Sequence, residues 1–400
     1  GGPLPEAPLS LPLARQVGGT VTSSVPLDPV AVALAGEWLF LSEVPGAGGA
    51  SPGDVHIIQH VDGNWGTYGS VSVPAMGSDA EFGGAIAAEG RSLVVGAPGL
   101  AVPAVMAYLL NEAGTGWGTE PLEILPSTQG INSSTRFGAS LDMHKDTLVV
   151  SAPEESDGRV YVFQWDSAAS SWEEVHSLSP STVTVTQFGC QVALSPDALT
   201  LAVAASGGTA GALGSVFVYT RYGDSLSSAD WTLEDVIPLT TAFIAADVSL
   251  AVESSVLMVG IPSIDTVYMF ECVSSSWGLS ASGTFSGFGW GSSLAMLGNN
   301  FVVGAPLYAE GRTVLGALAL VNYVDDGVND VSYVASPHPA QLEGGGFGNT
   351  IAVDHDNARV CSFGVDSSLN MRLYVLEDVD VYLSAPSEVV YGLSPYSVTL

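Results

Sequence analysis

The stretch Phe137-Gly138-Ala139-Ser140-Leu141, followed by Leu148-Val149-Val150-Ser151-Ala152-Pro153 and then Gly158-Arg159-Val160-Tyr161-Val162-Phe163, decides the fold. Each segment is short, rich in β-branched or aromatic residues, and bounded by residues that favour turns. A fourth apolar segment, Glu173 to Leu178, follows Trp172. The sequence therefore predicts a unit of four short antiparallel strands.

The same order of motifs returns along the chain. Phe82-Gly83-Gly84 leads to Val95-Gly96-Ala97-Pro98, and Phe288-Gly289-Trp290 leads to Val303-Gly304-Ala305-Pro306. Weaker copies begin at Phe188, Phe243 and Phe347. These Phe residues are spaced about 45 to 59 residues apart, and a period near 50 residues with four strands per repeat is typical of a β-propeller blade.

This pattern resembles the FG-GAP repeat family, the propeller type of integrin α-subunit heads. The resemblance covers about residues 15 to 380 and rests on five FG anchors, three GAP-like motifs and the downstream Gly-x-Val-Tyr-Val-Phe segment. It implies an all-β fold of four-stranded antiparallel blades.

Seven blades are expected, starting near residues 28, 82, 137, 188, 243, 288 and 347, the first of them a degenerate copy. Residues 14–27 are predicted to complete the last blade and so to close the ring at about 14–384. Val379 to Ser384 is the alternative closing strand. Residues 1–13 are interpreted as an extended arm, and residues 385–400 as a second arm or the start of a stalk or further domain.

Composition limits the possible partners. The chain has 9 basic and 41 acidic residues, a net charge of −32, which repels nucleic acid and anionic membranes. No run reaches the ~18 apolar residues that a membrane-spanning helix needs, so direct insertion into a membrane is not expected. The three cysteines lie in strand-like segments and are interpreted as buried thiols.

Metal sites are not expected from the sequence. The resemblance implies calcium loops between first and second strands, but those turns are here too short and mostly too poor in carboxylates to supply six or more oxygens. Ca²⁺ remains an alternative at the acidic cluster Asp325, Asp326, Asn329 and Asp330, where a solvated turn is favoured. Asp142-x-His144 and Asp354-His355-Asp356 occupy equivalent turns, but three ligands from one tight turn rarely converge on a transition metal.

The sequence contains no nucleophile elbow, no HExxH pair and no isolated Cys-His pairing. On this ground no catalytic residue, no cofactor and no enzymatic activity are predicted. A propeller attached to a hydrolase is the least favoured alternative.

Function is instead expected in the longer loops that connect strands two and three and successive blades. Candidate partner-binding residues in these loops are Glu154, Glu155, Asp157, Tyr308, Glu310 and Arg312. Asn132 begins an N-glycosylation sequon, relevant if the source is a eukaryote with a secretory route.

The prediction is an extracellular or cell-surface recognition or adhesion module that binds a protein or glycan through loops on one face. Residues 1–27 are rich in Pro and Gly and are not interpreted as a signal peptide, so a secreted protein is expected to have had its signal removed. The alternative is a structural subunit of a surface filament, sheath or appendage that assembles through the terminal arms.

Overall fold

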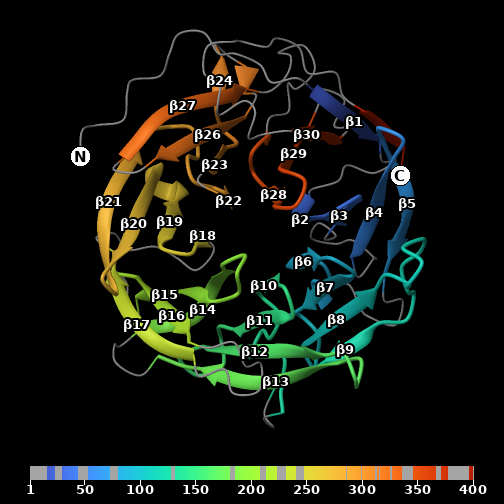
Figure 1. Ribbon diagram of the computed structural model, residues 1–400, viewed down its shortest axis with the longest axis horizontal. Helices are drawn as coiled ribbons and strands as arrows, with labels where there is room; N and C mark the ends of the chain where they lie inside the picture. The colour runs from blue at the N-terminus through green and yellow to red at the C-terminus, as the bar shows by residue number, and fades with distance from the viewer. Residues whose placement is uncertain are drawn as a thin grey trace.

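The computed structural model shows seven blades around a ring, each built on four antiparallel strands, which confirms the predicted seven-bladed β-propeller (Figure 1). The sheet of blade 7 carries a fifth strand. The structure describes residues 16–22, 29–43, 53–72, 80–127, 131–180, 185–207, 213–222, 231–239, 247–284, 286–298, 300–310, 313–314, 316–324, 327–335, 346–365, 371–376 and 396–399. None of its helices within these ranges is long and apolar enough to cross a membrane.

The first three blades follow one another along the chain. Blade 1 contains β2 (Pro29–Ala35), β3 (Trp38–Glu43), β4 (Asp54–Val61) and β5 (Asn64–Val71). Blade 2 contains β6 (Ile86–Glu89), β7 (Ser92–Ala97), β8 (Ala104–Leu109) and β9 (Leu122–Ile124). Blade 3 contains β10 (Leu141–His144), β11 (Thr147–Ala152), β12 (Arg159–Asp166) and β13 (Ser171–Leu178).

The next three blades repeat this order. Blade 4 contains β14 (Val185–Leu194), β15 (Thr200–Gly207), β16 (Ser215–Arg221) and β17 (Trp231–Pro238). Blade 5 contains β18 (Ser249–Glu253), β19 (Val256–Ile261), β20 (Thr266–Val273) and β21 (Ser276–Thr284), with the 3-10 helix η2 (Pro262–Ile264) after β19. Blade 6 contains β22 (Leu294–Leu297), β23 (Asn300–Ala305), β26 (Ala317–Val324) and β27 (Gly327–Ala335), and a small hairpin of β24 (Ala309–Glu310) and β25 (Thr313–Val314) extends from it.

Blade 7 is formed by both ends of the chain. Its strands β28 (Ile351–Asp354), β29 (Arg359–Val365) and β30 (Met371–Leu376) are completed by the N-terminal β1 (Gln16–Thr22), which pairs antiparallel with β30. This pairing confirms closure by the N-terminal strand. A further strand that the sequence did not predict, β31 (Tyr396–Thr399), pairs parallel with β1. The alternative closing strand 379–384 and the arm 1–13 lie outside the described residues.

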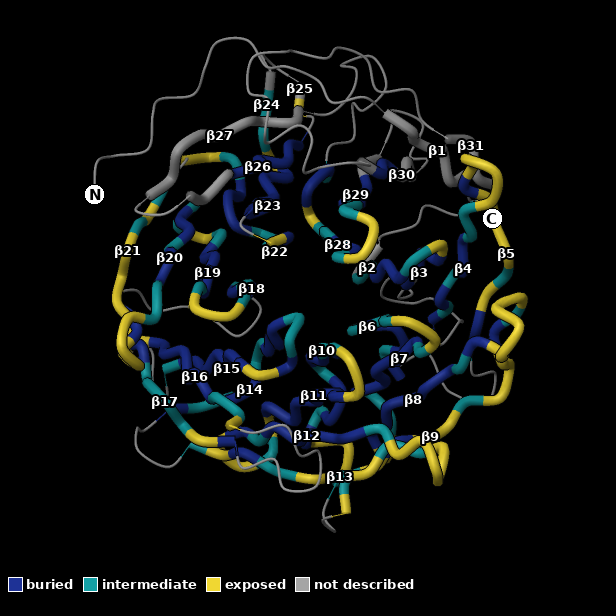
Figure 2. The backbone as a smooth tube through the Cα atoms, in the orientation of Figure 1, coloured by how far each residue is buried: buried dark blue, intermediate teal, exposed yellow. Residues whose placement is uncertain are grey.

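The core lies between neighbouring blades. Phe82, Phe137, Phe188 and Phe347, which begin repeats, are fully buried. Phe137, for example, packs on Tyr161 and Phe163 of its own blade within a cluster that also contains residues of blade 2. Figure 2 shows the result: the inner strands are largely buried, whereas the outermost strands β5 and β21 are mostly exposed.

The FG and GAP glycines meet at the blade interfaces. A Cβ added to Gly96, Gly260 or Gly304 would lie only 2.2, 2.4 or 1.9 Å from the carbonyl oxygen of Gly138, Gly291 or Gly348, respectively, in the next blade. The motifs therefore recur because two backbones approach too closely for any side chain.

Tryptophans occupy one repeated position at or near the start of the outer strand. Trp65, Trp117, Trp231 and Trp277 are buried, and Trp172 is partly buried. These rings contribute to packing at the outer edge of the blades.

Candidate functional site

The axial channel is lined by the seven innermost strands, β2, β6, β10, β14, β18, β22 and β28, together with the turns that follow β14 and β28. Most lining side chains are Ala, Val, Leu, Ile or Met, and they enclose a cavity of about 180 Å³. This volume is large enough for several water molecules.

A second cavity, of about 220 Å³, lies at the end of the channel where first strands turn into second strands. It shares Leu34, Ala88, His144, Pro196, Val353 and His355 with the channel, so the two are continuous. Its remaining lining includes Glu89, Lys145 and Asp356. We call this polar region the channel mouth.

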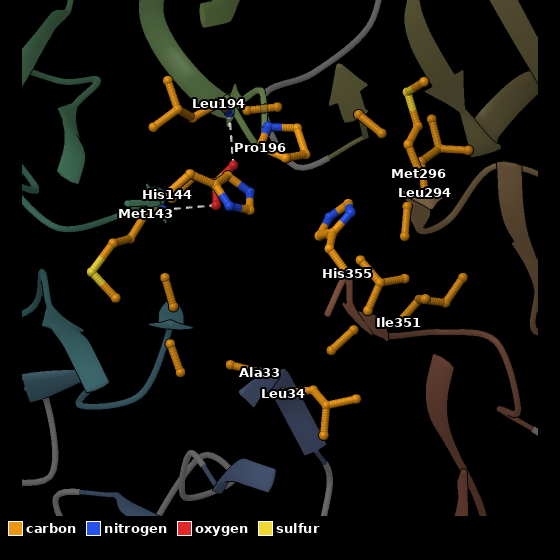
Figure 3. A pocket seen from close by; sticks show the side chains of 18 of the residues that line it. Ala33, Leu34, Met143, His144, Leu194, Pro196, Leu294, Met296, Ile351 and His355 are labelled. Carbon is orange, nitrogen blue, oxygen red and sulfur yellow. Dashed lines mark hydrogen bonds between the residues drawn. The ribbon is translucent and has the colours of Figure 1, made fainter. Parts of the chain in front are cut away.

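Two imidazoles from different sides of the ring meet at the channel mouth. His144 is the last residue of β10 in blade 3, and His355 directly follows β28 in blade 7. Their ring centroids lie 5.6 Å apart and their planes make an angle of 78°. Figure 3 shows both rings pointing toward each other across the cavity.

Glu89 of blade 2 holds His144 in place. Nδ1 of His144 lies 2.9 Å from Oε2 of Glu89, and the imidazole nitrogen donates because an ionised carboxylate can only accept. The other carboxylate oxygen accepts a hydrogen bond of 2.8 Å from the backbone N–H of Lys145. The Lys145 ammonium donates in turn to the carbonyl oxygen of Asp197 in blade 4, at 3.0 Å. The mouth is therefore tied together across three blades.

The carboxylates of Asp142 and Asp354 accept hydrogen bonds from backbone N–H groups. Asp142 accepts hydrogen bonds from the N–H groups of Met143, at 2.8 Å, and of Leu194 in blade 4, at 2.7 Å, both drawn in Figure 3. Asp354 accepts from the N–H groups of Asp356 and Asn357. Both carboxylates shape the turns and place negative charge near the two imidazoles.

The surroundings separate the pKa values of the two histidines. Burial lowers the pKa of His144, but the hydrogen bond to Glu89 and the charge of Asp142 outweigh it and raise this pKa above its ordinary value. Burial and the neighbouring His144 lower the pKa of His355. Titratable pairs with separated pKa values are typical of functional sites.

The loop residues predicted to bind a partner belong to blade 3 and blade 6. Glu155 forms an ion pair with Arg159, whose Nε lies 2.9 Å from Oε1 of Glu155, and its Oε2 accepts a hydrogen bond of 2.7 Å from the Tyr161 hydroxyl. Exposed Glu154 lies 3.9 Å from Arg136. Asp157 is also exposed, and its carbonyl oxygen accepts from the N–H of Phe188.

Tyr308 lies between β23 and β24 in blade 6, whereas Glu154 and Glu155 lie between β11 and β12 in blade 3. Figure 1 shows these two blades on different sides of the ring. The ring of Tyr308 lies 5.2 Å from that of Phe288. Arg312 lies outside the described residues, and only the backbone of Glu310 is described. These assignments stay predictions.

The proposed acidic cluster is described only in part. Asp325 and Asp326 lie outside the described residues, and Asn329 and Asp330 belong to β27, whose side chains are not described. Within the part of the chain that the structure describes, no group of three or more His, Cys, Asp or Glu side chains is arranged to hold a metal ion. Asn132 is exposed, and its Oδ1 accepts hydrogen bonds from Ser134 of the sequon.

The channel mouth was not predicted as a site. The sequence indicates that the two histidine turns are equivalent, but neither turn alone carries a convergent set of metal ligands. Equivalent turns of a propeller all surround one axis, and that property of the repeat could have indicated that His144 and His355 meet.

Comparison with known proteins supports the fold. A model of the FG-GAP repeat matches residues 129–163, whereas no curated protein sequence matches the chain. The structure resembles that of U3-55K, with a TM-score of 0.55, 12% identity, and coverage of 91% of this chain and 99% of that chain. It also resembles a Lactobacillus plantarum protein, with a TM-score of 0.52, 14% identity, and coverage of 77% and 85%.

A third similar structure is that of a putative 6-phosphogluconolactonase from Bacteroides uniformis, with a TM-score of 0.51, 10% identity, and coverage of 84% of this chain and 95% of that chain. This finding corrects the prediction that the protein is not an enzyme, which was wrong. That prediction relied on local catalytic motifs, whereas propeller sites assemble from turns far apart in sequence, so missing motifs exclude no activity.

The fold, the repeat match and the blade-to-blade glycine contacts agree with one another. The chain is a seven-bladed β-propeller that carries an FG-GAP repeat at residues 129–163.

Proposed function

We propose that the protein is an extracellular or cell-surface recognition propeller that binds the end of a glycan at the channel mouth. The observation that carries this proposal is the convergence of His144, His355, Glu89 and Lys145 on one cavity that continues into an apolar channel. A concave site with a few convergent polar groups is the usual form of a small-ligand site.

The chemistry of the mouth suits a sugar. Sugar hydroxyls both donate and accept hydrogen bonds, and the mouth offers carboxylate acceptors, imidazoles that can do either, and one ammonium donor. The net charge of −32 opposes sulfated or phosphorylated glycans. We therefore expect a neutral or amine-bearing sugar.

Binding of the labelled protein to a glycan array tests this proposal. The mouth variants His355→Ala and Asp356→Asn should no longer bind the glycans that the wild type binds on the array. Glu154→Gln, at the opposite end of the strands, is the matched control and should bind like the wild type. If only Glu154→Gln loses glycan binding, the binding site lies on the opposite face of the ring. If the wild type binds no glycan, a protein partner is favoured.

A reaction on the bound molecule is a second candidate function. The observation that favours it is the His144–Glu89 pair, since an imidazole oriented by a carboxylate is a common general base. The similarity to a protein titled a putative 6-phosphogluconolactonase suggests a sugar lactone as the first substrate to assay. Hydrolysis by the wild type that is lost in His144→Ala would support this candidate.

A further inference from the structure

The spacing of the two mouth histidines matches that of two ligands on one metal ion. Two imidazoles on a tetrahedral ion, with metal–nitrogen distances of about 2.0–2.1 Å, have ring centroids about 5 Å apart. The centroids of His144 and His355 lie 5.6 Å apart. The observed centroid distance is therefore close to the one that two imidazoles on a common ion would have.

The hydrogen bonds leave the required nitrogens available. Nδ1 of His144 donates to Glu89, which fixes the ring and leaves the lone pair on Nε2. A carboxylate that orients a histidine in this way is the usual support of a histidine ligand. Among the described residues, neither nitrogen of His355 forms a hydrogen bond.

The electrostatics and the free volume favour a cation. Asp142 and Glu89 act on both imidazoles through their negative charge. The mouth cavity of about 220 Å³ provides room for water molecules beside the rings. Because two imidazoles are borderline-soft ligands, they favour Zn²⁺, Cu²⁺, Ni²⁺ or Co²⁺ over Ca²⁺ or Mg²⁺.

We propose that the channel mouth binds one divalent transition-metal ion through Nε2 of His144 and a ring nitrogen of His355. Water fills the remaining coordination positions, so two protein ligands suffice and no third side chain is needed. Glu89 acts as a positioning residue, because it contacts His144 and not the ion. The site shares its cavity with the proposed glycan site but does not depend on glycan binding.

Titration of the chelator-treated full chain with Zn²⁺ and with Co²⁺ tests the proposal. Calorimetry should show one Zn²⁺ per chain, and Co²⁺ should give the visible absorption of a nitrogen-ligated ion. His144→Ala and His355→Ala should each lose this binding. Glu89→Gln should weaken it by about 10- to 100-fold, as expected for the support of a histidine ligand.

His176→Ala, in the outer strand β13, is the matched control and should bind like the wild type. Circular dichroism and the melting temperature of each variant establish that it is folded. Absence of Zn²⁺ binding by the wild type at millimolar concentration, or unchanged binding by folded His355→Ala, would overturn the proposal. Glycan binding is measured separately on the metal-free wild type. Absence of metal binding can therefore be distinguished from absence of glycan binding.

Discussion

Substitution of one GAP glycine should weaken the ring far more than substitution of an exposed strand glycine. In Gly304→Ala, the new Cβ would lie 1.9 Å from the carbonyl oxygen of Gly348 in blade 7 and 2.4 Å from Oγ of Ser293. Real Cβ contacts essentially never fall below 3.0 Å. The two backbones must therefore separate by roughly 1 Å at the interface of blades 6 and 7.

Overpacking of a well-packed interior costs about 1–3 kcal/mol, and a clash with backbone belongs at the upper end of that range. With an unfolding entropy of about 2.1 cal/mol/K per residue, a loss of about 3 kcal/mol lowers the Tm of a chain of this length by about 4 °C. Differential scanning calorimetry measures this shift.

Gly278→Ala is the matched control, because Gly278 lies in β21 with no atom within 4 Å of the added Cβ. We expect its Tm to stay within about 1 °C of the wild type, since an exposed substitution changes stability by about 0.5 kcal/mol or less. Equal melting of the two variants would refute the role assigned to the blade-to-blade glycine contacts.

Three further predictions concern the junction of the ring and one of its thiols. Burial raises the pKa of Glu37, but the hydrogen bond from His60 and the charge of Arg359 outweigh it and hold this pKa below its ordinary value. A group with a lowered pKa stabilises the fold at pH values above its unfolded-state pKa, and this stabilisation is lost as the pH falls through the folded-state pKa. Glu37→Gln should therefore lower the Tm at pH 7 but not at pH 3. Equal Tm shifts at the two pH values would contradict this role of Glu37. Deletion of residues 1–22, which contain β1, should expose the edge of β30 and raise the mass measured by light scattering above that of the full chain. An association state equal to that of the full chain would mean that β1 does not close the ring. Burial raises the pKa of Cys361 to about 12, so this thiol should not react with a disulfide reagent at pH 8 until the protein unfolds, and rapid labelling of Cys361 in the native state would contradict its burial.

The fold could be predicted because its determinants recur in the sequence. Phe137-Gly138 and the GAP-like segments carry the blade interface, and every repeat needs the same close backbone approach. Blade 1 lacks the FG and GAP motifs, but it still has a fully buried aromatic residue, Phe40, in β3. By contrast, β31 and the β24–β25 hairpin follow no repeat pattern, so nothing in the period indicated them.

The site could not be predicted to the same degree. The hydrogen bond between His144 and Glu89 joins adjacent blades. The contact between His144 and His355 depends on how the ring closes. Neither relation is visible as a local motif. The sequence shows the negative charge of Glu154 and Glu155, whereas only the structure shows that Arg136 and Arg159 lie beside them.

Histidine NMR of the metal-free protein tests the assembled channel mouth most directly. Among the six histidines, the pKa of His144 should lie above its ordinary value of about 6.5 and that of His355 below it. His144→Ala should raise the pKa of His355, because a neighbouring positive charge is removed. Titration of both residues at the ordinary value, with no response of His355 to His144→Ala, would contradict the account.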